Sequence, residues 1–119
     1  MSDTLIEGID YEAGLAQYQM KKIYDRILGT YLRTVPEILD TLAAFSEEGL
    51  KDYIITVHGL KGASYGVQAN HIGDLAKELE FAGKDGTVAF IEENNQHLID
   101  ETNRLLARLK VYLDEQEQG

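Results

Sequence analysis

The chain has 119 residues, a formal net charge of −10 and no cysteine. Its length suits one domain with a single hydrophobic core, and the lack of cysteine excludes disulfides, thiolate catalysis and cysteine-based zinc sites. So acidic a surface repels the phosphate backbones of nucleic acids and also anionic membrane surfaces, which makes both poor partners.

Neither a membrane span nor a secretory signal is visible in the sequence. No apolar run approaches the roughly 20 residues that a transmembrane helix needs. Residues 1–10 lack both the basic start and the apolar stretch of a signal peptide. We therefore expect a soluble cytoplasmic protein that forms a single domain over residues 1–119, and we expect it to be monomeric.

Helical spacing begins near the N-terminus. Asp10 is a candidate cap for a short helix through Tyr11 and Leu15. From Met20 to Tyr31, apolar residues recur at the three- and four-residue intervals of one helical face. This spacing predicts a longer second helix.

The segment around Pro36 allows two interpretations. Thr34 and Glu37 have the spacing of a capping box, and Pro36 falls in the first turn, where its missing N–H costs nothing. This pattern predicts a new helix with an apolar face over residues 35–45. The same residues also fit one long helix with a kink at the proline.

Three further helices are predicted in the second half of the chain. Apolar residues line one face over 50–64, and this helix ends near Gly66. Asn70 is a candidate N-cap of the next helix, which the glycine-containing segment 83–86 ends. Thr87 can cap a long final helix, in which every seventh residue is apolar: Ile91, Leu98 and Leu105.

The predicted fold is all-α. No segment shows the alternation of a strand, and the short connections favour antiparallel packing of successive helices. The sequence therefore predicts an antiparallel up-down four-helix bundle with a short additional helix at the N-terminal end.

The most informative segment begins at His58 and reads His-Gly-Leu-Lys-Gly-Ala-Ser. A helix turns by about 100° per residue, so if Val57 points into the core, His58 lies at the flank of the apolar stripe and is reachable from solvent. Gly59, Gly62 and Gly66 then lie together on the outward face. This arrangement predicts an exposed imidazole beside a surface without side chains.

Such a surface has a cost and a use. Each glycine inside a helix destabilises it by about 1 kcal/mol relative to alanine. A helix that only packs gains nothing from glycines on its solvent side, whereas removing side chains beside a histidine lets another protein's active site approach. Lys61, one turn after His58, puts a cation where an anion on the imidazole would lie. Together these features indicate a phosphoryl carrier.

The segment resembles the histidine-containing phosphotransfer (HPt) family over nearly the whole chain. The family's pattern is a histidine, a lysine and a glycine at the third and fourth positions after it, and then small residues. The matching residues are His58, Lys61, Gly62, Ala63 and Ser64, followed on the next helix by Ile72, Leu75, Leu79 and Glu80. Ten residues after the histidine the family usually has glycine in a turn; here it is Gln68, so we expect the turn to differ locally.

The resemblance implies a function and further site residues. It implies that His58 carries a phosphoryl group between receiver-domain aspartates, or from a histidine kinase to a response regulator. It also implies that Glu80 hydrogen-bonds the imidazole and that Lys84 is a basic residue near the site. The implied partners are receiver domains of response regulators or hybrid sensor histidine kinases, which would dock on Gly59, Gly62, Gly66 and Lys84.

The protein is expected to be a carrier and not a kinase. Its glycines at 59, 62 and 66 lie in a helical pattern and do not form a nucleotide-binding loop. It should therefore not phosphorylate itself from ATP. We expect no cofactor of its own and Mg²⁺ only in the receiver domain.

Two other classes of function are compatible with a helical bundle. One is a protein-interaction module without phosphotransfer, against which the intact set of His58, Lys61 and Gly62 argues. The other is a metal-binding bundle, but the spacings of His71 and His97 from His58 match no helical ligand pair, and no Glu-x-x-His motif occurs. The starting methionine and the complete bundle favour a free-standing protein over a domain of a hybrid kinase.

Overall fold

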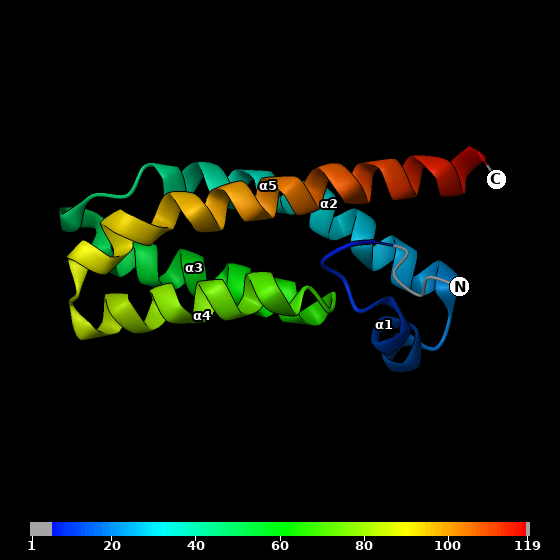
Figure 1. The fold of residues 1–119 in the computed structure, drawn as a ribbon, viewed down its shortest axis with the longest axis horizontal. Helices are drawn as coiled ribbons and strands as arrows, with labels where there is room; N and C mark the ends of the chain where they lie inside the picture. The colour runs from blue at the N-terminus through cyan, green and yellow to red at the C-terminus, as the bar shows by residue number, and fades with distance from the viewer. Residues whose placement is uncertain (1–5, 119) are drawn as a thin grey trace.

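The computed structural model describes residues 6–118, and over this range the all-α prediction is confirmed. The helices are α1 (Tyr11–Tyr18), α2 (Lys21–Ala43), α3 (Leu50–Gly66), α4 (Asn70–Asp85) and α5 (Val88–Gln118), with a short 3-10 helix, η1 (Glu47–Gly49), before α3 (Figure 1). None of the helices in this range has the length and apolar character needed to cross a membrane.

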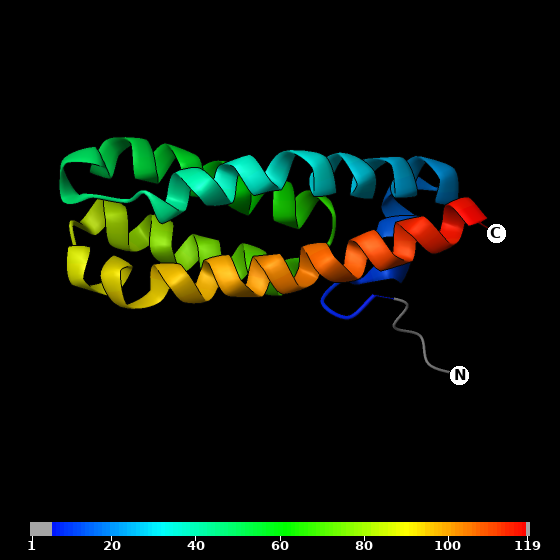
Figure 2. The same ribbon diagram turned by 90° about the horizontal axis from the view of Figure 1, so that it is seen from above.

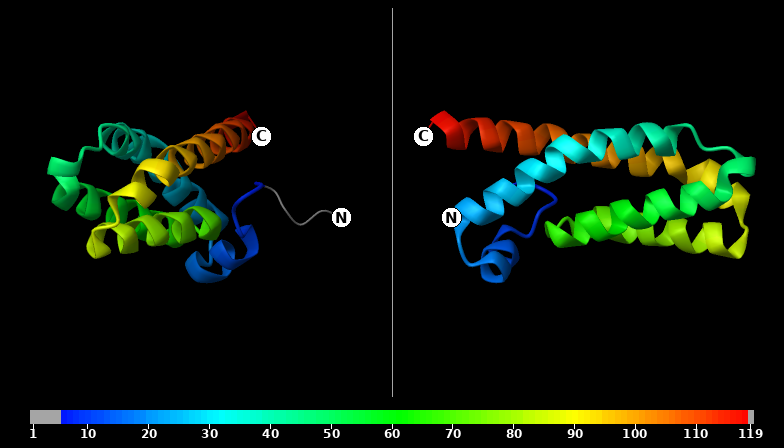
Figure 3. Two further views of the ribbon diagram at one scale, coloured as in Figure 1. Left: turned by 60° about the vertical axis from the view of Figure 1, so that its left-hand side comes forward. Right: turned by 180° about the vertical axis from the view of Figure 1, so that it is seen from behind.

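The four long helices lie along the long axis of the molecule. Figure 2 shows the chain reversing direction at each connection from α2 to α5. α3 and α4 pack closely on each other, while α5 packs on both α2 and α4. The start of α2 and the end of α5 extend past α3 and α4, and the short α1 lies at that end (Figure 3).

Side chains from all five α-helices form one core. The apolar residues that α5 repeats every seven positions are buried as predicted, and α3 contributes Val57 and Leu60. Ser64 also faces inward, where its hydroxyl lies 2.8 Å from that of Tyr31. Met20 and Ile23, which the spacing placed on the apolar stripe of α2, are instead exposed; Met20 precedes the helix.

Of the two interpretations of the segment around Pro36, the single long helix is confirmed and the helix start at Thr34 is wrong, because α2 continues through Pro36. The Thr34 hydroxyl donates to the Thr30 carbonyl oxygen at 2.9 Å and caps nothing. The reason is the packing of α2 against the other helices. One unbroken inward face of α2 joins the residues before and after the proline, and burying this face outweighs one missing backbone hydrogen bond. Its buried members are Tyr24, Leu28, Tyr31, Val35, Leu39 and Leu42.

The other helix ends lie close to their predicted positions. The Asp10 carboxylate caps α1 by accepting from the Ala13 N–H at 3.1 Å. Asn70 is the first residue of α4 and not its cap, since Ala69 occupies the cap position. α4 continues past Gly83 and ends at Asp85, and Thr87 directly precedes α5.

Gln68 keeps the backbone that a glycine would adopt in the turn between α3 and α4. Its φ is +68°, in the left-handed region that glycine enters without strain. Its carbonyl oxygen accepts from the Asp10 N–H at 3.0 Å, and its side-chain amide donates to Gln17 at 2.6 Å. The expected local difference therefore lies in the side chain, which contacts α1, and not in the left-handed backbone.

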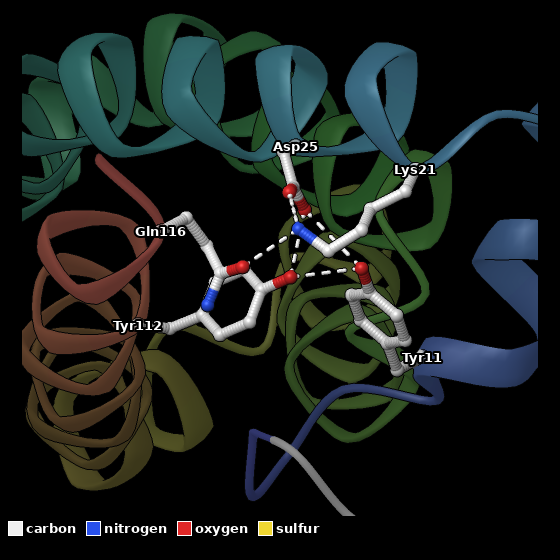
Figure 4. A network of polar contacts seen from close by, with 5 residues as sticks. All are labelled: Tyr11, Lys21, Asp25, Tyr112 and Gln116. Carbon is white, nitrogen blue, oxygen red and sulfur yellow. Dashed lines mark hydrogen bonds and ion pairs between the residues drawn. The ribbon is translucent and has the colours of Figure 1, made fainter. Parts of the chain in front are cut away.

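A polar network joins α1, α2 and α5 at the end where α2 begins (Figure 4). The Asp25 carboxylate accepts from the Tyr112 hydroxyl at 2.9 Å and from Lys21 at 2.6 Å, while Tyr11 lies 3.3 Å away. Lys21 also donates to Gln116 at 2.7 Å. Burial raises the pKa of the Tyr112 hydroxyl far above its ordinary value, so this hydroxyl stays a donor.

Candidate functional site

His58 lies in the middle of α3 with its side chain exposed. The side chain is 63% accessible, whereas the neighbouring Val57 is fully buried. Nδ1 of His58 lies 2.8 Å from Oε2 of Glu80 on α4. One edge of the imidazole is thus anchored to the adjacent helix while the ring remains open to solvent.

Glu80 is buried and holds three donors. Its side chain is 5% exposed. Oε1 lies 2.7 Å from Nζ of Lys61, and Oε2 lies 3.1 Å from Nζ of Lys84 in addition to its contact with His58. These partners replace the water that a buried carboxylate loses. The structure therefore brings together the four predicted residues His58, Lys61, Glu80 and Lys84.

The charge of Glu80 determines which nitrogen of His58 carries the proton. Burial alone would raise the pKa of this carboxyl group, but hydrogen bonds from Lys61, Lys84 and His58 together lower the pKa to about 2. Near neutral pH the group is a carboxylate, which only accepts hydrogen bonds. Nδ1 of His58 must therefore be the donor, and Nε2 of the neutral ring carries the available lone pair.

Two glycines of α4 allow the close packing of α3 and α4 on which these contacts depend. A Cβ added at Gly73 would lie 2.5 Å from the ring of Tyr65, and one added at Gly83 would lie 2.7 Å from Ile54. Both neighbours belong to α3, and the glycines lie on either side of Glu80 in the sequence. Without a Cβ at these positions, α4 can lie close enough to α3 for the Glu80 carboxylate to reach His58.

The outward face of α3 is bare at the three glycines that follow His58. A Cβ added at Gly59, Gly62 or Gly66 would meet nothing within 4 Å. Ile55, one turn before His58, has a side chain that is 70% exposed. The sequence reasoning found the glycines but missed Ile55, although its three-residue offset from His58 places it on the same face.

The remaining histidines do not join the site. Nε2 of His71 lies 3.6 Å from Glu101 on α5. Among residues 6–118, no three histidine, aspartate or glutamate side chains come close enough to hold a metal ion.

The fold and the site define a class of protein: a helical bundle that presents an exposed histidine whose ring is anchored by a buried carboxylate. The family model for the Hpt domain matches residues 26–117, from within α2 to near the end of α5. The chain therefore belongs to the Hpt domain family, whose members act in histidine phosphotransfer and interact with receiver domains of two-component systems. No curated protein and no solved structure matches the chain.

Proposed function

We propose that this protein is a phosphocarrier of a phosphorelay. His58 accepts a phosphoryl group from the aspartate of one receiver domain and passes it to the aspartate of another, or carries it from a histidine kinase to a response regulator. The observation that carries the proposal is the exposed His58 imidazole, with Nδ1 held 2.8 Å from the buried Glu80 carboxylate. A histidine that served only to pack would need neither the exposure nor the anchor.

The chemistry asks little of the protein beyond the position of the ring. The Nε2 lone pair attacks the phosphorus of an aspartyl phosphate, an N–P bond forms, and the P–O bond to the aspartate breaks with its electron pair leaving on the carboxylate. The imidazole keeps its Nδ1 proton and becomes positively charged, and the Glu80 carboxylate stabilises this charge. In the second transfer a carboxylate attacks the phosphorus, and the neutral ring leaves.

Lys61 and Lys84 stabilise the phosphorylated form. A phosphoryl group brings about two negative charges to the surface near neutral pH. Both ammonium groups are already within hydrogen-bond distance of Glu80, next to His58. We propose that they offset part of the new charge and that Glu80 prevents them from being drawn away into solvent.

The glycine surface admits the partner. In-line transfer requires the aspartate of the receiver domain to come into contact distance of Nε2, which bulky neighbours of His58 would prevent. Gly59, Gly62 and Gly66 leave this approach open. We propose that the receiver domain docks here and near Lys84, that it supplies the Mg²⁺, and that the carrier acts as a cytoplasmic monomer without autokinase activity.

Transfer of labelled phosphate from a panel of phosphorylated receiver domains tests the proposal. The parent protein should take up label from at least one receiver, and His58→Gln should take up none. The matched controls are His71→Gln and His97→Gln, which should be labelled like the parent. Label in His58→Gln would overturn the assignment of the acceptor. A parent protein that binds receivers but never takes up label would instead be an interaction module.

A further inference from the structure

A basic hollow lies on the α4 side of His58. It has a volume of about 100 Å³ and is lined by Lys61, Lys77, Glu80, Phe81 and Lys84. Three lysines thus gather beside the site in a protein whose net charge is −10. Glu80 is the one acidic residue of its lining, so the hollow is net positive, unlike the molecule as a whole.

Lys77 differs from the other two lysines of the hollow. Lys61 and Lys84 are paired with the Glu80 carboxylate. Lys77 is exposed and forms no ion pair with any residue between 6 and 118. Its ammonium group is therefore available to a negative charge that comes from outside the chain.

Phe81 adds an apolar surface beside these charges. It follows Glu80 directly, and its side chain is 68% exposed. It also lines a wider groove of about 620 Å³ that reaches Thr87 and Phe90 and has Lys77 on its wall, between the acidic residues Asp74 and Glu78. The hollow and the groove thus share Lys77 and Phe81, which makes one continuous surface from the His58 site to the start of α5.

We propose that Lys77 and Phe81 form a recognition surface for the phosphorylated receiver domain, in addition to the glycine face of α3. This inference rests on the proposed function. A site that holds a phosphorylated aspartate and Mg²⁺ is lined by carboxylates, so an acidic carrier needs local cations to receive it. Lys77 faces an acidic side chain at the rim of that site, and Phe81 packs against an apolar side chain next to it.

The two residues contribute differently to transfer. A rim charge acts mainly on the rate of association and is screened by salt, whereas an apolar contact is not. Lys77→Gln should lower kcat/KM for transfer from a receiver domain by about fivefold at low salt and by less than about twofold at high salt. Phe81→Gln should lower kcat/KM at both salt concentrations. Neither variant should change kcat, because neither side chain touches the reacting atoms.

Matched controls separate recognition from general effects. Lys22→Gln removes an exposed lysine of α2 that has no ion-pair partner among the described residues, and Val111→Ala shortens a 59% exposed apolar side chain of α5. Both controls should transfer like the parent. Thermal unfolding should show parent-like stability for Lys77→Gln and Phe81→Gln, since both side chains are exposed.

The outcomes distinguish this inference from the proposed function. If the parent takes up label while Lys77→Gln and Phe81→Gln behave like their controls, the α4 surface is not used and the phosphocarrier function stands. If no receiver labels the parent, the proposed function fails first. Sedimentation at two protein concentrations adds one more test: a dimer that Phe81→Gln abolishes would assign the groove to a second copy of the chain and overturn the inference.

Discussion

Glu80 makes the stability of the protein depend on pH in a defined window. Its pKa is lowered from 4.5 to about 2 in the folded state, so its contribution to stability is complete above about pH 4.5 and is lost as the pH falls toward 2. The shift corresponds to at most about 3 kcal/mol. We expect Glu80→Gln to lower the free energy of unfolding at pH 7, and we expect the difference from the parent to shrink between pH 4.5 and 2.

Urea unfolding at pH 7, 4 and 2.5 measures this difference. Glu78→Gln is the control, because Glu78 is an exposed glutamate of the same helix. Its stability should follow that of the parent at each pH. A Glu80→Gln protein as stable as the parent at pH 7 would contradict the role of the buried carboxylate.

Gln68 allows a direct test of backbone strain. In a left-handed conformation, a residue with a Cβ is strained by about 1–2 kcal/mol relative to glycine. Glycine in turn loses more chain entropy on folding, by about 0.5–1 kcal/mol, so the relief of strain should exceed this cost. Both Gln68→Gly and Gln68→Ala lose the hydrogen bond to Gln17, but only the glycine variant relieves the strain. Gln68→Gly should therefore be more stable than Gln68→Ala by about 0.5–1 kcal/mol in urea unfolding. Equal stabilities would show that the strain in the turn is no larger than the entropy cost of glycine, which would contradict the prediction.

At the scale of single residues, the sequence predicts what depends on local helix geometry. The exposure of His58 and the openness of the surface at Gly62 follow from three- and four-residue offsets on one helix. The exposed side chains of Lys77 and Phe81 could not be related to His58 in the same way. Their position beside it depends on how α4 packs against α3, and the spacing of residues within α4 does not determine this packing.

Among the elements, α3 is a continuous helix although it contains glycines, which weaken helices. Gly62→Gln should raise the free energy of unfolding by up to about 1 kcal/mol, because glutamine favours a helix more than glycine does and the added side chain meets nothing within 4 Å. The same side chain should slow phosphotransfer by obstructing the receiver domain. Thermal unfolding and labelled-phosphate transfer measure the two effects. Transfer at the parent rate would remove the docking role of the glycine surface.

α2 shows why helix boundaries are harder to predict than helices. The capping-box spacing of Thr34 and Glu37 is a local signal, and it competes with an apolar face that extends on both sides of Pro36. Burial of Tyr31 and Val35 against other helices decides in favour of one continuous helix. The local signal alone could not reveal this, because its strength does not depend on what the face packs against.

For the whole molecule, the network around Asp25 holds α1 to the bundle. Asp25→Leu would leave Lys21 and the Tyr112 hydroxyl without their shared acceptor. We expect a loss of about 1–3 kcal/mol in the free energy of unfolding. The phosphotransfer rate per folded molecule should be unchanged, because the network shares no residue with the site around His58.

Thermal unfolding and transfer assays on the same samples test this separation. Asp114→Leu is the control, since it removes an exposed acid of α5 that pairs with Lys110. It should leave the midpoint of unfolding close to that of the parent. A transfer defect in folded Asp25→Leu would show that the network is coupled to the site around His58.

The glycines that let α4 approach α3 restrict which amino-acid substitutions this protein can accept during evolution. A Cβ at Gly73 or Gly83 would meet Tyr65 or Ile54 and not His58, yet a larger residue at either position would push α4 away from α3 and withdraw the Glu80 carboxylate from the imidazole. In a library of all single substitutions selected for signalling, both positions should tolerate few replacements. Second-site changes to smaller residues at 65 or 54 should restore tolerance only at the facing glycine. Lineages of this protein would then change these positions in pairs, and an alignment of its relatives would record the pairing as covariation.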